Sequence, residues 1–376
     1  MPVYLDCNAT TPIEPRVAEL VTQFLVEEFG NSGSRTHEFG ARAKRAVNEA
    51  RKAVAAVVNA DPSEVVFTSG ATESNNLAIL GLADALRENG LTHVLSTSIE
   101  HKAVLEPLER LEEQGFDVEL LRPDDSGRVS ASQVDEALRP ETGLVSVMHV
   151  NNETGIKQPI TEIAETLGSH QTYFHVDAAQ GFGKLPEINS PRVDLVSVSG
   201  HKVYAPKGIG ALIARRRGHT RTPLTPLMVG GGQERGRRPG TLPVHLIVGL
   251  GEASRIAVKE RDKRTKRCLE LRTQLLECFS PLPHQINGNL QDVIPSTLSV
   301  SLTGIDAEAA IVCLKEVVAI SNGAACTSTS YQTSHVLEAM GLKEGRARAT
   351  LRWSWCHMTP DIPVAEIREA LVPLTG

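Results

Sequence analysis

The sequence lacks any apolar run long enough to cross a membrane, which takes about 20 residues. Its first residues, MPVYLDCNATTP, also lack the basic segment and apolar core of a secretory leader. Neither an internal repeat nor a low-complexity segment is evident. We therefore expect a soluble, globular protein of the cytoplasm that does not interact with membranes.

Paired cysteines are also missing. The six cysteines stand at positions 7, 268, 278, 313, 326 and 356, and no two have the Cys-x-x-Cys spacing of a zinc site. The spacing does not suggest a disulfide framework either, so we expect free thiols in a reducing compartment and no bound metal. No G-x-G-x-x-G motif follows the first expected strand, which makes a nicotinamide cofactor a poor fit.

The sequence also lacks an excess of positive charge. The formal net charge is −6, and the basic stretches ARRRGHTR and ERGRRPG are short enough to be solvated loops. This balance argues against broad adhesion to nucleic acid or to an anionic membrane. We expect no direct binding to DNA.

The chain does contain a regular alternation of short apolar runs and helical patterns. With 376 residues, 41% of them hydrophobic, it can bury a large core and build two domains. Helices are expected over 14–29 and 38–58, after which runs such as EVVFTSG, HVLSTS and LVSVMHV alternate with amphipathic segments. Strands that are apolar on both faces indicate a mostly parallel sheet sandwiched by helices, an α/β architecture.

The pattern of apolar and charged residues changes near residue 256. A long charged helix there leads into STLSVSLTG, AEAAIVCLKE, VVAISNGAAC and a final helix near 363–373, which is typical of a smaller α+β domain. We therefore predict a large domain over 15–255. Residues 1–14 and 256–376 would form the small domain.

Residues that could carry chemistry follow four of the expected strands, where ligands bind in open α/β sheets. A turn at Gly70 begins a helix whose free N–H groups can hold a phosphate. His101 starts another helix, Asp177 interrupts an apolar strand, and Lys202 follows the run VDLVSVSGH. Taken singly, each has an ordinary explanation: a glycine turn, a helix-end histidine, a buried salt bridge and a solvated charge.

Taken together, these residues fit pyridoxal phosphate. That cofactor needs a lysine for a Schiff base, a carboxylate facing its pyridinium nitrogen, donors for its phosphate and often a flat side chain over its ring. The sequence offers one candidate for each requirement: Lys202 for the Schiff base, Asp177 for the ring nitrogen, the turn at 70–72 for the phosphate and His101 for the ring face. A lysine beside a cationic ring can also have the lowered pKa that the chemistry needs.

Eight motifs then follow one another over almost the full length: YLDCNATTP, FTSGATESNNLAI, EHKAVLEPL, MHVNNETG, HVDAAQ, SGHKVYAPKGIGAL, GGGQERGRRPGTLPV and NGAACTS. In this order they resemble the motifs of pyridoxal-phosphate cysteine desulfurases, in the long-loop group of the class V aminotransferase family. The resemblance implies the PLP-dependent transferase fold (aminotransferase fold type I) and a homodimer. It also implies conversion of L-cysteine to L-alanine, with the sulfur left on an enzyme cysteine as a persulfide.

The resemblance assigns cofactor roles to the matching positions. Lys202 would form the Schiff base, Asp177 would pair with the pyridinium nitrogen, and His101 would stack on the ring and assist proton transfer. Gln180 would hydrogen-bond the phenolic oxygen of the cofactor. The phosphate would be bound by Ala71, Thr72, Ser199 and His201 of one subunit and by Thr241 of the neighbouring subunit.

Two further residues are implied to hold the substrate. Asn152 would contact both the cofactor and the substrate carboxylate, and Arg352, in LRWS, would clamp that carboxylate with its bidentate fork. After Arg352 the chain reads SWCHMT, where many relatives have a glycine and a basic residue. We interpret Cys356 there as filler, and we assign no role to Cys7 in LDCNATTP.

The residues around Cys326 indicate a nucleophile independently of the resemblance. NGAACTSTSYQTS surrounds it with small and hydroxyl side chains, so we expect a mobile loop, whereas Cys313 in AAIVCLKE has the apolar setting of a buried, inert thiol. A thiol with a pKa near ~8.5 must be shifted toward the thiolate before it attacks. The same sulfur would first meet the substrate and later meet an acceptor protein.

Several alternatives stay open at this point. A selenocysteine lyase or an aminotransferase would share the fold, although an aminotransferase needs no cysteine on a loop, and a non-enzymatic scaffold would retain Lys202 and Asp177 only as relics. The sequence most resembles the desulfurase of bacterial DNA phosphorothioation systems, with GNSGSRTHEFG, IEHKAVLEPLE and GGGQERGRRPGTLP as the closest stretches. Housekeeping desulfurases for iron–sulfur clusters or tRNA thiolation share nearly every residue discussed.

Overall fold

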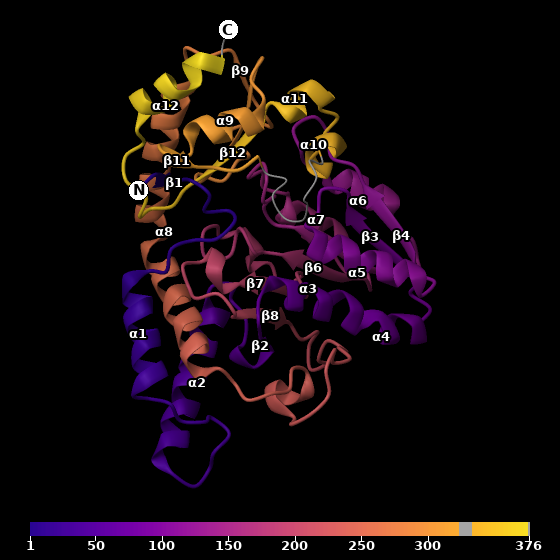
Figure 1. Cartoon of the computed structure of the whole chain (residues 1–376). Coiled ribbons are helices and arrows are strands. Elements are labelled where there is room, and N and C mark those ends of the chain that lie inside the picture. Colours follow the sequence, from indigo (N-terminus) through magenta and orange to yellow (C-terminus); the bar gives the residue numbers. More distant parts are fainter. Residues whose placement is uncertain (323–332, 375–376) are drawn as a thin grey trace.

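The computed structural model describes residues 1–322 and 333–374, and its centre is a seven-stranded sheet (Figure 1). In spatial order the strands are β2 (Val65–Thr68), β8 (Gly210–Ala214), β7 (Leu195–Ser199), β6 (Tyr173–Asp177), β5 (Thr142–Met148), β3 (His93–Thr97) and β4 (Asp117–Leu121). All neighbours from β7 to β4 pair in parallel, and β8 runs antiparallel to both of its neighbours. The mostly parallel sheet expected from the sequence is confirmed.

Helices cover both faces of this sheet because its strands are apolar on both faces. In β2, for example, Val65 and Phe67 join one core, and Val66 between them joins the other. The first core includes residues of α1 (Pro15–Val26), α2 (Glu38–Ala56), α6 (Ala131–Ala137), α7 (Ile160–Leu167) and α8 (Val244–Phe279). The second includes residues of α3 (Ala71–Ile79), α4 (Ala83–Glu88) and α5 (Lys102–Glu113).

Two smaller sheets lie in the C-terminal part together with the first residues of the chain. One has the order β12–β10–β9, and the other pairs β1 with β11 in parallel. Trp353, Trp355 and Phe279 are fully buried in the core beside them. The elements of this part are β1 (Val3–Tyr4), β9 (His284–Ile286), β10 (Thr297–Leu302), α9 (Ala307–Leu314), β11 (Val318–Ala319), α10 (His335–Ala339), α11 (Glu344–Arg348), β12 (Thr350–Ser354) and α12 (Val364–Leu371).

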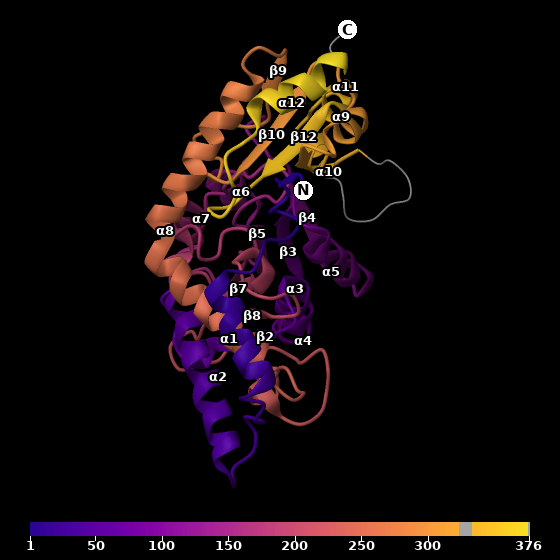
Figure 2. The same ribbon diagram turned by 60° about the vertical axis from the view of Figure 1, so that its left-hand side comes forward.

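A single long helix, α8, connects the two parts. Figure 2 shows it running from α1 and α2 at one end to α12 at the other. Its residues up to 257 pack into the core of the large sheet, and its residues from 268 onward pack into the core of the small sheets. The predicted boundary between the two domains, at residues 255 and 256, falls inside the continuous helix α8. No break in the secondary structure marks this boundary, so it stays a prediction.

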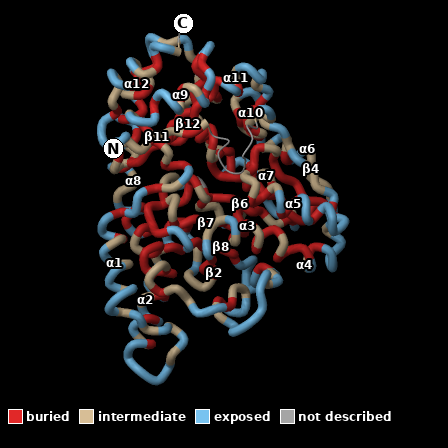
Figure 3. The backbone as a smooth tube through the Cα atoms, in the orientation of Figure 1, coloured by how far each residue is buried: buried red, intermediate tan, exposed pale blue. Residues whose placement is uncertain are grey.

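Burial follows this arrangement. Figure 3 shows the buried backbone concentrated in the strands of the large sheet and exposed backbone at the end where α1 leads into α2. Large apolar side chains are exposed at that end, including Phe29 at 70% and Phe39 at 51%, whose rings stack on each other. In the part of the chain that the structure describes, no helix has both the length and the apolar character needed to span a membrane.

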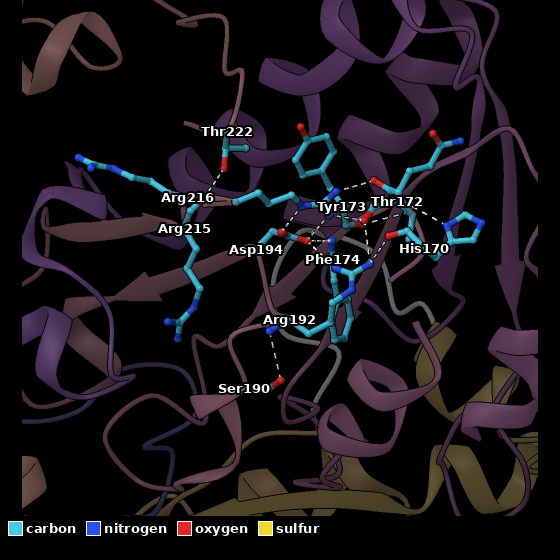
Figure 4. A network of polar contacts seen from close by, with 12 residues as sticks. His170, Thr172, Tyr173, Phe174, Ser190, Arg192, Asp194, Arg215, Arg216 and Thr222 are labelled. Atoms are coloured by element: carbon cyan, nitrogen blue, oxygen red, sulfur yellow. Dashed lines mark hydrogen bonds and ion pairs between the residues drawn. The ribbon is translucent and has the colours of Figure 1, made fainter. Parts of the chain in front are cut away.

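A buried cluster of charged residues connects the strands of the large sheet at the edge opposite their carboxyl ends (Figure 4). Asp194 is 3% exposed and lies directly before β7. Its carboxylate accepts hydrogen bonds from Arg192 Nη1 (2.8 Å), Arg217 Nε (2.7 Å) and the backbone N–H of Phe174 (2.8 Å). The same arginines donate to backbone carbonyls, and Arg217 stacks over the ring of Tyr173. We call this set of residues the Asp194 cluster.

Replacing Asp194 with Asn keeps the size of the side chain but removes the counter-charge of both arginines. We expect Asp194→Asn to lower the free energy of unfolding by about 3 kcal/mol, the order found when a buried ion pair is broken from one side. Urea unfolding followed by circular dichroism measures this change. The control is Asp117→Asn, which breaks an exposed pair with Arg139 and should lower stability far less. Equal losses in the two variants would contradict the buried role of Asp194.

Candidate active site

A cavity of about 500 Å³ opens at the carboxyl ends of the parallel strands, where the sequence predicts the site. It is lined by ten of the predicted site residues: Ala71, Thr72, His101, Asn152, Asp177, Gln180, Ser199, His201, Lys202 and Arg352. These residues come from both the large sheet and β12 of the small one. The structure thus brings together segments that are 281 positions apart in the chain, from Ala71 to Arg352.

Lys202 ends a tight 3₁₀ turn, Gly200–Lys202, directly after β7. A side chain on Gly200 would lie only 2.7 Å from Ile209 Cγ2 and 2.8 Å from the Ile209 carbonyl oxygen, so this close turn requires glycine. The amine of Lys202 donates to the backbone carbonyls of Asn8 and Ala9, the latter at 2.7 Å. Lys202 is therefore held at the rim of the sheet and is not a freely solvated charge.

Asp177 is the last residue of β6 and is 6% exposed. Its Oδ2 accepts a hydrogen bond from Asn75 Nδ2 (2.7 Å), and its Oδ1 accepts one from the backbone N–H of Ala179 (2.9 Å). Both donors are neutral. The carboxylate thus borders the cavity with its charge uncompensated by these donors, which suits a cationic ligand group.

His101 is both a helix-end residue and a cavity residue. It is the N-cap of α5, where its Nδ1 accepts a hydrogen bond from the backbone N–H of Ala103 (3.0 Å). Burial lowers the pKa of His101, and the Lys202 cation adds to this effect while the Asp177 carboxylate opposes it. Because Nδ1 accepts, the neutral imidazole carries its proton on Nε2.

Directly before His101 lies a second buried acid, Glu100. Its Oε1 accepts hydrogen bonds from Thr97 Oγ1 and from the backbone N–H of Met148, both at 2.8 Å. Its Oε2 is buried and has no hydrogen-bond partner among the described residues. Burial raises the pKa of Glu100 to about 8, so this carboxyl group is mostly protonated at neutral pH.

The start of α3 could serve as an anion cradle at one end of the cavity. Gly70 is the N-cap of α3, and a Cβ on it would meet no atom within 4 Å, so there is open space beside the start of the helix. The first N–H groups of a helix lack partners within it and can hold an anion. Ser199 and His201 line the same cavity. Burial and the nearby Lys202 cation lower the pKa of His201 to about 4, which leaves its imidazole neutral.

Elsewhere in the cavity lining, Arg352 and Asn152 are joined directly. Arg352 donates Nη1 to the backbone carbonyl of Asn152 (3.1 Å) and Nη2 to Asp6 Oδ1 (2.7 Å). Its Nε is buried without a hydrogen-bond partner among the described residues. The guanidinium group therefore retains donor capacity for a further carboxylate.

Two functional features were missed in the sequence. Asn75 is fully buried and donates a hydrogen bond to Asp177. It stands among other polar residues in ATESNN at the start of α3, so the sequence did not distinguish it. The second is Asn8, whose carbonyl accepts from Lys202 and from Gln180 Nε2 (3.0 Å) and whose Nδ2 donates to the carbonyl of Asn152 (3.0 Å). No sequence signal identified Asn8, because its partners are all distant in the chain.

Four predicted or considered positions lie outside this arrangement. Cys326 lies outside the described residues. Thr241 is exposed and does not line the cavity of the single chain. Cys7 and Cys356 are buried against each other and Tyr204; a hydrogen bond to Cys356, together with burial, raises the pKa of Cys7, whereas the same bond lowers the pKa of Cys356 to about 6.

The expectation that Cys313 is a buried thiol is wrong. Cys313 is exposed on α9, whose buried positions are Ala307, Ala310 and Leu314. These three residues are three and four positions apart, so they lie on one face of the helix, the face that packs into the core. Cys313 lies beside this face. An apolar run in the sequence did not reveal which side of the helix faced the core.

The donor set of the cavity fits pyridoxal phosphate. It combines a lysine amine, a buried carboxylate with neutral donors, a neutral imidazole and an anion cradle. Gln180 also borders the cavity with a buried Oε1 that has no hydrogen-bond partner among the described residues. In the described ranges, no group of three or more His, Cys, Asp or Glu side chains has the arrangement of a metal site.

Known proteins agree with this chemistry. The Aminotransferase class-V family matches residues 3–361. The cysteine desulfurase IscS of Vibrio campbellii is 46% identical over 382 residues, covering 100% of this chain and 94% of that protein. The crystal structure of DndA from Streptomyces lividans is 51% identical with a TM-score of 0.83, covering 94% of this chain and 99% of that one. The structure of SspA in complex with cysteine is 40% identical with a TM-score of 0.83, covering 96% and 99%. The chain therefore belongs to the class V aminotransferase family and is a pyridoxal-phosphate-dependent cysteine desulfurase.

Proposed function

We propose that this desulfurase converts L-cysteine to L-alanine at the cavity described above, moves the sulfur to Cys326 as a persulfide, and passes it to an acceptor protein for DNA phosphorothioation. The observation that carries the proposal is the meeting of the Lys202 amine, the Asp177 carboxylate and the Arg352 guanidinium at one cavity. Pyridoxal phosphate, when bound, supplies an electron sink for the substrate carbons.

Each residue of the cavity has a defined task in this proposal. Lys202 anchors the cofactor and, once released from it, moves the α-proton of the substrate. Asp177 balances the positive ring nitrogen. Arg352 and Asn152 hold the carboxylate of cysteine, with Arg352 Nε as an available donor. Gln180 hydrogen-bonds the phenolic oxygen of the cofactor.

Proton transfer on the substrate sulfur falls to His101. Its lowered pKa keeps the imidazole neutral, with the ring proton on Nε2 because Nδ1 accepts from the Ala103 N–H. Once Nε2 has given up that proton to a substrate group, it can take the thiol proton. The Cys326 thiolate then forms a bond to the substrate sulfur while the carbon–sulfur bond breaks. The electron pair of that bond stays with the substrate carbon, which takes up a proton and leaves as part of alanine.

We further propose that the enzyme acts as a homodimer in which Thr241 of the partner subunit reaches the phosphate. Exposed apolar side chains that cluster on a surface favour a subunit contact, because monomers rarely expose large contiguous apolar patches. They include Phe29, Phe39, Met228 at 47% and Val229 at 92% exposure. The exposure of Thr241 within one chain fits the same proposal.

The assignment to DNA phosphorothioation rests on the resemblance of the sequence to the desulfurase of such systems, and it is the pathway that we favour. Iron–sulfur cluster assembly, which the sequence left open, is the second candidate. The chain is 51% identical to DndA and 45% to 46% identical to the IscS cysteine desulfurases. The net charge of −6 favours sulfur delivery through a protein partner over direct contact with DNA.

We also propose a cytoplasmic location. All five described cysteines are free thiols, which is typical of a reducing compartment.

Lys202→Ala tests the anchor. The variant should lose the visible absorbance band of lysine-linked cofactor, and alanine formation should fall by about 10³-fold or more, because covalent and acid–base roles are lost together. Absorbance after gel filtration and an alanine assay measure the two effects. Lys44→Ala, at an exposed position of α2, should behave like the unmodified enzyme. A band that survives removal of free cofactor in Lys202→Ala would refute the anchor.

Cys326→Ser tests the nucleophile. Without added thiol, this variant should form no persulfide and almost no alanine, while its cofactor absorbance stays unchanged. Cys313→Ser is the matched control, because it removes an exposed thiol from α9 and should leave the rate intact. Undiminished turnover by Cys326→Ser would show that another group accepts the sulfur.

The pathway is tested by the choice of acceptor. Enzyme loaded with ³⁵S-cysteine is mixed with acceptor proteins of a DNA phosphorothioation system or with an iron–sulfur scaffold protein from the same cell. We expect the label to leave the enzyme at least tenfold faster for the phosphorothioation acceptor. The opposite preference would assign the enzyme to cluster assembly without affecting its desulfurase activity.

A further inference from the structure

One charged residue of the cavity has no part in the function described so far. Lys207 lines the cavity from the loop between the turn at Lys202 and strand β8. Its side chain is exposed, and among the described residues it forms no hydrogen bond or ion pair.

The backbone places Lys207 beside the anion cradle. Gly210, at the start of β8, pairs with Ser199 on one side and with Thr68 on the other. A side chain on Gly210 would come within 2.6 Å of the Gly70 Cα, so β8 begins in contact with the turn that precedes α3. Lys207 is three residues before this contact, and its neighbour Gly208 also lines the cavity.

Among the described residues that line the cavity, the cradle otherwise lacks positive charge. It offers hydroxyl groups, the first amides of α3 and the neutral imidazole of His201, whose pKa of about 4 results mainly from burial. The charge of Lys207 itself acts in the same direction on His201, which indicates that the two groups are near each other. A phosphate monoester, with a second pKa near ~6, is largely a dianion at neutral pH and needs a counter-charge.

The other two lysine or arginine residues among the described residues that line the cavity are already engaged. Lys202 donates to the carbonyls of Asn8 and Ala9, and Arg352 pairs with Asp6. Beside α3, Arg238 donates to Glu73 in the first turn of the helix, at 2.9 Å. Among the described residues that line the cavity, Lys207 is therefore the cation that is available to an anion at this end.

We propose that Lys207 is a further binding residue for the phosphate of the cofactor, and that it supplies the counter-charge for the dianion. This inference rests on the proposed placement of the phosphate at the start of α3. Lysine suits the task as a point charge on a long, flexible stem, which reaches the phosphate without a fixed bidentate geometry.

The test compares two ligands that differ only in the phosphate. Apo-enzyme is titrated with pyridoxal phosphate and with pyridoxal, and binding is followed by absorbance. Lys207→Met should weaken pyridoxal phosphate binding about tenfold at low salt, the effect of one hydrogen bond to a charged group, and should leave pyridoxal binding within about twofold. The loss should shrink as the salt concentration rises.

Two controls complete the experiment. Lys207→Arg keeps the charge and should retain most of the affinity, and Lys44→Met makes the same change of charge on α2, away from the cavity. An equal loss for both ligands, or no loss at all, would overturn the role of Lys207. The titrations are repeated in Lys202→Ala, where the phosphate-dependent difference persists without the covalent anchor, so failure of the anchor and failure of Lys207 give different results.

Discussion

The hydrogen bonds from Lys202 to the carbonyls of Asn8 and Ala9 join the beginning of the chain to the turn after β7. The same carbonyl of Asn8 accepts from Gln180, and the Asn8 side chain contacts Asn152 and Thr297. The N-terminal segment therefore forms a wall of the cavity. Without it, the amine would lose its fixed acceptors, and Gln180 and Asn152 would lose a shared neighbour.

This wall also links the cavity to the small sheets. The backbone N–H of Cys7 donates to the carbonyl of Ser354 (3.0 Å), and the backbone N–H of Asn8 donates to the Ser354 hydroxyl (2.9 Å). Ser354 is the last residue of β12, the strand that carries Arg352. The positions of the lysine and of the arginine are thus connected through two residues at the start of the chain. Any shift of β12 relative to the large sheet would change the distance between the groups that we propose hold cofactor and substrate.

The sequence predicted the layered fold well because its signals are local. Each strand of the large sheet carries its own apolar run, and helices expected over 14–29 and 38–58 occur as α1 and α2 with ends shifted by a few residues. The cavity residues that follow strand ends were found for the same reason: parallel strands deliver Asp177 and Lys202 to one edge.

What the sequence left out depends on distant contacts. Asn8 acts through partners at positions 152, 180 and 202, and Asn75 acts through Asp177, so no local pattern marks them. Cys313 was misjudged because the apolar run around it does not specify which side of α9 meets the core. The resemblance to a family supplied the roles of Gln180, Thr241 and Arg352, which spacing alone did not give.

Three buried carboxyl groups illustrate three ways in which the negative charge of a buried carboxylate can be balanced or removed. Asp194, before β7, has two arginines as donors, and its cost of burial is offset by their charge. Glu100 has only neutral donors, and burial raises its pKa to about 8, so a proton removes its charge. Asp177 also has neutral donors, but it borders a cavity that an aromatic cation can enter. The first arrangement serves stability and the second fixes the strand ends beside His101. We propose that the partner of Asp177 is instead a ligand, the positive ring of the cofactor. This proposal accounts for a buried carboxylate that has neutral protein donors and borders a cavity.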